Sequence, residues 1–110
     1  MGSPRLTCLG GLGMLQHAPV AGMTFALAGE RTTIGRSPQS DVSIPQGHSD
    51  QSNVARLHAI VAVEGGGVTV RDAGSTNGTY MRGERVGESR LAGGDEVAIC
   101  GVFRFRLDGA

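Results

Sequence analysis

Short runs of alternating apolar and polar residues, separated by glycine-rich turns, most constrain what this chain can fold into. The clearest run lies near the C-terminal end, where Phe103, Phe105 and Leu107 alternate with two arginines. A period of two is typical of a strand with one buried face. Similar short runs recur along the chain, and no ten-residue helical period interrupts them. The sequence therefore predicts an all-β fold, an antiparallel β-sandwich of about eleven short strands.

The expected strands follow these apolar runs. They cover about 4–12, 23–27, 31–35, 42–44, 57–63, 68–72, 79–81, 85–86, a short stretch around 91, 95–99 and 102–107. Met23, Phe25 and Leu27 are expected on one half-buried face of the second strand. Val68 and Val70 are expected on the inner face of the sixth strand.

Length and charge place limits on the class of protein. A chain of 110 residues suits one domain with a single modest core. Ten acidic residues balance ten arginines, and a net charge of zero argues against nucleic acid or an anionic membrane as partner. No long apolar run and no leader pattern is visible, so a soluble, cytoplasmic protein is expected. Residues 1–5 are expected to be an N-terminal extension or expression scar, and residues 6–108 the domain.

A polar loop interrupts the apolar runs between Asp72 and Tyr80. It contains Gly74-Ser75-Thr76-Asn77-Gly78, and Asn-Gly readily takes the positive φ of a tight reversal. One interpretation is a hairpin turn with polar decoration. The other is a loop that offers hydrogen-bond donors to a ligand.

Three further motifs accompany this loop in a fixed order. Gly35-Arg36 precedes it, Arg56-Leu57-His58-Ala59 lies in the middle of the chain, and Leu91-Ala92-Gly93-Gly94-Asp95-Glu96-Val97 follows it. In this order and spacing the motifs resemble the forkhead-associated (FHA) domain, from about residue 6 to residue 107. The resemblance implies a β-sandwich with its binding loops gathered at one end.

The resemblance also implies a phosphothreonine-binding site. Arg36 matches the arginine that makes the family's main phosphate contact, and a guanidinium can form two parallel hydrogen bonds to a phosphate. Thr76 and Asn77 match residues that contact the phosphothreonine and the peptide backbone, and Arg56 matches a position beside the bound peptide. Structural roles are expected for Gly35, His58, Gly78 and Asp95.

One departure from the family pattern concerns the signature Ser-Xaa-Xaa-His. Three residues before His58 stands Ala55, so the serine hydroxyl that binds phosphate in the family is absent. Loss of such a bond, worth about 1.5–3 kcal/mol, predicts affinity weakened by about ten- to a hundredfold. Thr76 is one candidate for a compensating donor. Other candidates for compensating or flanking contacts are Ser49, Ser52, Asn53 and Ser75.

Three functions are compared against these residues. The favoured one is a bacterial phosphothreonine-peptide-binding module in Ser/Thr kinase signalling, whose partner is a phosphothreonine-containing protein, such as a kinase or its substrate. The alternative, which Ala55 favours, is a phosphorylation-independent assembly or scaffold domain with a degenerate phosphate site. An enzyme is not expected, because no nucleophile motif accompanies His17, His48 or His58.

No metal or cofactor is expected either. His48 and Asp50 stand two residues apart, but two ligands alone are weak evidence for a metal site. The two cysteines, Cys8 and Cys100, lack metal-ligand spacing and are too few for a disulfide framework. Both are expected to be small buried apolar side chains.

Overall fold

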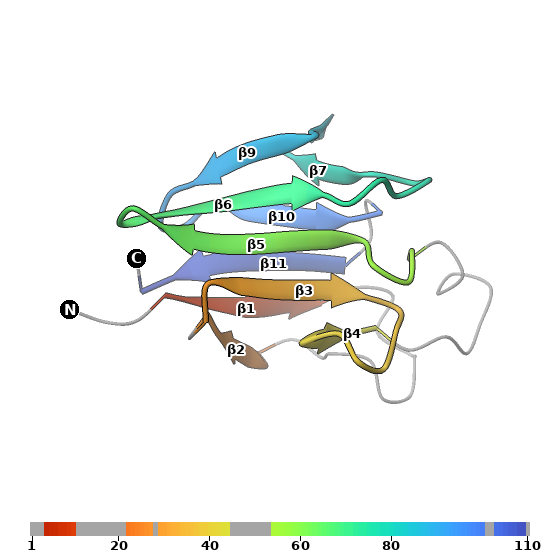
Figure 1. Ribbon diagram of the computed structural model, residues 1–110. Coiled ribbons are helices and arrows are strands. Elements are labelled where there is room, and N and C mark those ends of the chain that lie inside the picture. The colour runs from red at the N-terminus through yellow and green to blue at the C-terminus, as the bar shows by residue number, and fades with distance from the viewer. Residues whose placement is uncertain (1–3, 11–21, 28, 45–53, 101–102, 110) are drawn as a thin grey trace.

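The computed structural model describes residues 4–10, 22–27, 29–44, 54–100 and 103–109, which form a two-layer β-sandwich (Figure 1). The eleven strands are β1 (Arg5–Gly10), β2 (Thr24–Ala26), β3 (Arg31–Gly35), β4 (Val42–Ser43), β5 (Ala59–Glu64), β6 (Gly67–Asp72), β7 (Thr79–Met81), β8 (Glu84–Arg85), β9 (Glu88–Leu91), β10 (Glu96–Ile99) and β11 (Phe103–Asp108). The predicted fold class is confirmed.

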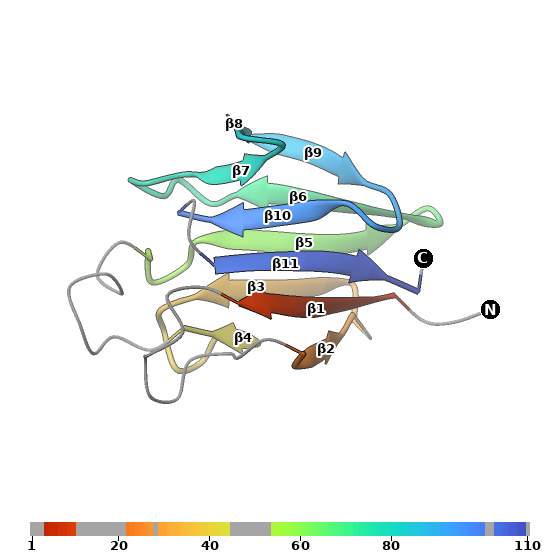
Figure 2. The ribbon, with the colours of Figure 1, turned by 180° about the vertical axis from the view of Figure 1, so that it is seen from behind.

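The two layers are a six-stranded and a five-stranded sheet. The order β2-β1-β11-β10-β7-β8 makes the larger sheet, which faces the viewer in Figure 2. The order β4-β3-β5-β6-β9 makes the smaller sheet, which faces the viewer in Figure 1. Strand β1 begins at Arg5, one residue before the domain boundary expected at Leu6.

One strand pair departs from the antiparallel prediction. Strands β3 and β4 pair in parallel, with Ile34 opposite Val42. The connection at 36–41 is too short for an ordinary crossover, and local hydrogen bonds return the chain instead. The Asp41 carboxylate accepts the backbone N–H and the hydroxyl of Thr33 at 2.9 and 3.2 Å. These bonds lay β4 alongside β3 in the same direction.

The core lies between the sheets and follows the predicted alternation. Phe103, Phe105 and Leu107 are buried, and so are Val68 and Val70. The apolar faces of the two sheets therefore meet, which is what stabilises a sandwich.

Burial was predicted for Met23, Cys8 and Cys100, and the three differ in how far they are buried. Met23 is 44% exposed, because strand β2 is a three-residue edge strand and Met23 lies just before it. Cys8 is buried as expected, whereas Cys100 is only half-buried and takes a positive φ of 49°.

The strand directions gather several loops at one end of the sandwich. The described ends of the connections after β3 and β6 and before β5 lie away from the two termini (Figure 1). This is the arrangement that the FHA resemblance implied. Within the described residues, the structure contains no helix long and apolar enough to span a membrane.

Candidate functional site

The backbone that follows β3 lies directly against segment 54–56. The Arg36 N–H donates to the Ala55 carbonyl at 2.8 Å, and the Ser37 N–H donates to the Arg56 carbonyl at 3.2 Å. A Cβ at position 35 would stand 2.1 Å from the Arg56 carbonyl oxygen, a distance that no side chain tolerates. Gly35 therefore permits the close approach that fixes Arg36 beside Ala55.

The side chain of Arg36 is held as well as its backbone. Arg36 is half-buried, and its Nε donates to the Val54 carbonyl at 3.1 Å. A guanidinium carries five N–H donors in a planar fork that matches phosphate oxygens. The bond to Val54 orients this fork against segment 54–56.

His58 joins this segment to the polar loop after β6. Its side chain is 0% exposed, and its Nδ1 accepts the Ala55 N–H at 3.1 Å. Because Nδ1 is an acceptor, the neutral ring carries its proton on Nε2, which donates to the Gly78 carbonyl at 2.7 Å. Burial lowers the pKa of His58 and keeps the ring neutral. The buried ring of His58 thus links segment 54–56 to the loop after β6.

Asp72 organises the loop itself. Its Oδ2 accepts the backbone N–H groups of Gly74 and Ser75, both at 2.9 Å. Its Oδ1 accepts the Ser75 hydroxyl at 2.5 Å and the Thr79 hydroxyl at 2.8 Å. Partial burial alone would raise the pKa of Asp72, but these hydrogen bonds outweigh it and the pKa is lowered. An ionised Asp72 therefore fixes the loop at neutral pH.

Ser75 belongs to this internal network. It is 6% exposed, and besides donating to Asp72 its Oγ accepts the Gly78 N–H at 3.0 Å. The sequence placed Ser75 among candidates for a flanking ligand contact. Its hydroxyl instead closes the loop from within, since a carboxylate at the start of the loop competes successfully for it.

Thr76 and Asn77 occupy the exposed part of the loop, as the sequence predicted. Arg85 on β8, which the sequence motifs did not indicate, holds the backbone of this part of the loop. Its Nη2 donates to the Ser75 carbonyl at 3.0 Å and the Thr76 carbonyl at 3.3 Å. No local pattern marks Arg85, because it reaches the loop from a separate strand.

Gly78 allows this support. It has a φ of +92°, and a Cβ there would stand 2.8 Å from the Arg85 Nε. Glycine therefore serves both the left-handed backbone and the close approach of the guanidinium.

The structure brings two of the predicted binding loops into one hydrogen-bonded unit. From Arg36 the chain of bonds passes through Ala55 and His58 to Gly78, the neighbour of Asn77. Arg56 is exposed on the same segment as Ala55. Ser49, Ser52 and Asn53, the other candidates for compensating contacts, lie outside the described residues.

Asp95 lies elsewhere, in the turn before β10. Its carboxylate accepts the Ala92 N–H at 2.9 Å and pairs with Arg82 at 3.1 Å. These two contacts hold the turn at residues 92–95, and the structural role expected for Asp95 stays a prediction. The part of the chain that the structure describes contains no group of three or more His, Cys, Asp or Glu side chains placed to hold a metal ion.

This arrangement agrees with a comparison against known families, in which the model of the FHA domain matches residues 32–100. The chain belongs to the FHA-domain family. FHA domains bind phosphothreonine peptides of partner proteins, so residues 32–100 belong to a phosphopeptide-binding module of the kind found in bacterial signalling proteins.

Two bacterial regulators are among the similar proteins. The chain is 43% identical over 91 residues to the glycogen accumulation regulator GarA of Mycolicibacterium smegmatis, covering 83% of this chain and 54% of GarA. It is 42% identical over 96 residues to an oxoglutarate dehydrogenase inhibitor of Corynebacterium diphtheriae, covering 86% of this chain and 63% of the inhibitor. The chain thus spans only about half to two thirds of these relatives.

The fold is also that of a solved FHA domain studied for phosphothreonine-dependent interactions. The TM-score is 0.73 at 23% identity, with 96% of this chain and 95% of that chain covered. At this identity the likeness concerns the fold alone.

Proposed function

We propose that this domain binds a phosphothreonine peptide across the two loops that His58 joins. Arg36 forms bidentate hydrogen bonds to the phosphate, Thr76 contacts the phosphothreonine, and Asn77 pairs with the peptide backbone. The observation that carries this proposal is the hydrogen-bond chain from Arg36 through His58 to Gly78. Loops held this way lose little further freedom when a peptide binds, and preorganisation of this kind favours affinity.

Arg56 and Ala55 complete the proposed site. Arg56, exposed beside Ala55, contacts the peptide next to the phosphothreonine. Ala55 supplies no hydroxyl, so the phosphate makes one hydrogen bond fewer at this position. The proposed site is therefore weaker than one with serine at position 55, by about ten- to a hundredfold.

The partner in this proposal is a protein phosphorylated by a Ser/Thr kinase, or the kinase itself, in the cytoplasm. The names of the relatives suggest the role of the whole protein, since one regulates glycogen accumulation and another inhibits oxoglutarate dehydrogenase. We infer that this protein likewise controls a metabolic enzyme by binding it. Oxoglutarate dehydrogenase is the first candidate to assay.

Binding of a degenerate phosphothreonine peptide library and its unphosphorylated counterpart, followed by fluorescence anisotropy, tests the proposed site. Arg36→Ala is expected to abolish phosphate-dependent binding. Arg82→Ala, which removes a mostly exposed arginine paired with Asp95, is the matched control and is expected to bind as the unaltered protein does. Equal binding of phosphorylated and unphosphorylated peptides would overturn the proposal.

A phosphorylation-independent assembly domain is the second candidate, and Ala55 is the observation that favours it. In that case neither library binds the unaltered protein. Ala55→Ser would then create phosphopeptide binding where none existed, which would identify a site that has lost its original ligand.

A further inference from the structure

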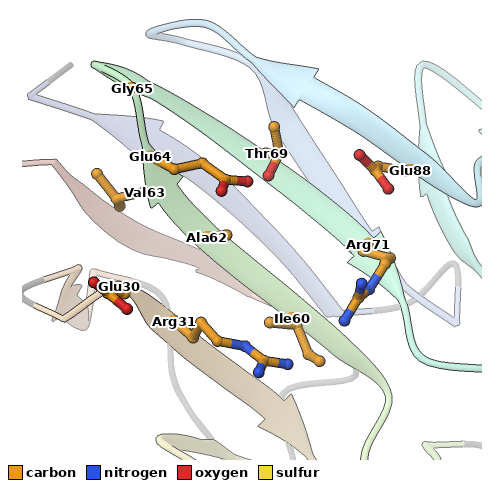
Figure 3. Close-up of a pocket in the computed structure, with 10 residues that line it drawn as sticks. All are labelled: Glu30, Arg31, Ile60, Ala62, Val63, Glu64, Gly65, Thr69, Arg71 and Glu88. Atoms are coloured by element: carbon orange, nitrogen blue, oxygen red, sulfur yellow. The ribbon is translucent and has the colours of Figure 1, made fainter.

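The outer face of the five-stranded sheet carries a hollow of about 600 Å³ (Figure 3). Side chains from β3, β5 and β6 line it, together with Glu88 of β9. Ala62 and Thr69, which face each other across β5 and β6, form a low floor in its centre. The hollow is therefore long enough to receive an extended segment and shallow enough to stay open to solvent.

Two arginines converge at one end of this hollow. Arg31 reaches in from β3 and Arg71 from β6, and in Figure 3 both guanidinium groups point toward Ile60 of β5. Within the described residues, neither guanidinium takes part in a salt bridge or a side-chain hydrogen bond. Two like charges directed at one place form a binding position for an anion, and Glu88, the cross-strand partner of Arg71, is the acidic side chain on their β9 side.

Ile60 lies beneath the two arginine side chains at this end of the hollow. It is only 6% exposed, although it lies on the outer face and no further layer of described residues covers that face. Arginine stems commonly cover apolar surface while their charged ends remain in water. The two arginines that line the hollow beside Ile60 therefore bury it and leave both charges accessible.

Acidic side chains also line the hollow. Glu64 and Glu30 lie toward the opposite end from the two guanidinium groups, and Glu88 stands opposite Arg71 in the β6–β9 register (Figure 3). The attraction for an acidic side chain is therefore greatest between Arg31 and Arg71, near Ile60, and weaker on the side of Glu88.

The cationic end adjoins the proposed phosphothreonine site. Arg71 immediately precedes Asp72, which organises the polar loop, and Ile60 lies two residues beyond His58. Two residues of strand span about 7 Å. A peptide held at the loops therefore needs only a few further residues to reach Arg31 and Arg71.

We propose that Arg31 and Arg71 form a second contact for the phosphothreonine partner, and that this contact binds an acidic segment with an apolar side chain that lies on the sheet face. The proposal rests on the proposed function, because the phosphothreonine supplies the first anchor. A second contact linked to the first raises the overall affinity through effective concentration. It also favours partners that carry acidic residues near the phosphothreonine.

The test starts from a phosphothreonine peptide that binds the domain. The peptide is extended on its N-terminal or on its C-terminal side by a flexible spacer of about six residues. The spacer ends in the tripeptide Glu-Leu-Glu or, for comparison, Gln-Leu-Gln. Such a spacer spans up to about 20 Å. The Glu peptide is expected to bind several-fold more tightly than the Gln peptide on one of the two sides. This difference is expected to vanish in the double variant Arg31→Gln, Arg71→Gln, while affinity for the unextended peptide stays the same.

Arg90→Gln is the matched control. Arg90 lies on the same sheet, but its guanidinium packs against Gly67: a Cβ added at Gly67 would stand only 2.2 Å from the Arg90 Nη2. This variant is expected to keep the preference for glutamate. Equal binding of the Glu and Gln peptides to the unaltered protein, on both sides, would overturn the proposal.

A second measurement separates this proposal from the proposed phosphothreonine site. Unphosphorylated Glu-Leu-Glu peptide, added at high concentration during NMR titration, is expected to shift the amide signals of Ile60 and Arg71 and to leave that of Asn77 unchanged. These shifts would be seen even if no phosphothreonine peptide bound. Absence of these shifts would contradict the proposed contact at Arg31 and Arg71 and would leave the proposed phosphothreonine site unaffected.

Discussion

The His58 Nε2 donates to the Gly78 carbonyl across 2.7 Å, and this bond couples the loop of Arg36 to the loop of Asn77. The same carbonyl accepts the Cys100 N–H at 2.8 Å, so it receives two hydrogen bonds. The other nitrogen of His58 accepts the Ala55 N–H. One neutral, buried imidazole therefore links two segments that are 20 residues apart, and its protonation would remove the acceptor for the Ala55 N–H.

Stability is expected to fall as the pH drops below about 6.5, because the folded state holds His58 with a lowered pKa. As the pH falls, His58 is protonated in the unfolded chain before it is protonated in the folded one. The fraction of unfolded protein therefore grows until the pH reaches the pKa of His58 in the folded state. The expected slope is at most about 1.4 kcal/mol per pH unit from this group. Denaturant unfolding at a series of pH values measures it.

His58→Gln is expected to be less stable at neutral pH but to lose little further stability between pH 7 and pH 5. The double variant His17→Gln, His48→Gln keeps His58 and serves as the control. If the slope disappears in the control and persists in His58→Gln, the assignment to His58 is wrong. Below about pH 4 the lowered pKa of Asp72 adds a second loss of stability as that carboxylate is protonated.

Ala55→Ser is expected to tighten phosphothreonine-peptide binding by about ten- to a hundredfold. The backbone of residue 55 is already fixed on both sides, by its carbonyl to Arg36 and by its N–H to His58. The new hydroxyl therefore enters an ordered position. Calorimetry with one phosphopeptide measures the gain, and Ala55→Cys, which adds a similar volume but only a weak donor, is the control. An equal gain from cysteine would contradict the hydrogen-bond explanation.

Gly35→Ala is expected to destabilise the domain by about 1–3 kcal/mol or more, because the added Cβ would stand 2.1 Å from the Arg56 carbonyl oxygen. The clash is with backbone, which has little room to move. Gly87→Ala is the matched control, since a Cβ there meets nothing within 4 Å. Denaturant unfolding distinguishes the two, and equal stability of both variants would show that segment 54–56 moves aside at little cost.

The fold could be predicted from the sequence because it follows from local patterns of residues. The alternation of Phe103, Phe105 and Leu107 follows from the period of a strand, and glycine turns mark where strands end. The parallel pairing of β3 and β4 was not predictable in this way. It depends on the Asp41 carboxylate returning to Thr33, and a side-chain bond across eight residues leaves no periodic signal.

The sequence predicted which residues make up the candidate site, but not how they are hydrogen-bonded. The order and spacing of a family pattern selected Arg36, Thr76 and Asn77 as binding candidates, and the same pattern assigned a bracing role to His58. Whether a hydroxyl points toward a ligand or into its own loop depends on which hydrogen-bond acceptors lie nearby. The Ser75 hydroxyl points into the loop because it donates to the Asp72 carboxylate. That competition exists only once the chain is folded.

Arg85→Ala is expected to weaken phosphothreonine-peptide binding by about tenfold without unfolding the domain. Arg85 holds the carbonyls of Ser75 and Thr76 at 3.0 and 3.3 Å, and hydrogen bonds from a charged group contribute about 1.5–3 kcal/mol. Without them Thr76 and Asn77 must be ordered by the peptide, at a cost to affinity. Fluorescence anisotropy measures the affinity, and amide hydrogen exchange at residues 75–77 measures the order of the loop.

Two variants separate the positioning role of Arg85 from its charge. Arg85→Lys keeps the charge without the planar fork, and Arg85→Gln keeps one carbonyl-directed donor group without the charge. If Arg85 acts by position, slower exchange at residues 75–77 accompanies tighter binding across the series Ala, Gln, Lys and Arg. If affinity instead depends only on charge, Lys binds as Arg does, Gln binds as Ala does, and exchange at the loop stays the same throughout. That pattern would leave Arg85 as a source of electrostatic attraction for the phosphopeptide, with no part in shaping the loop.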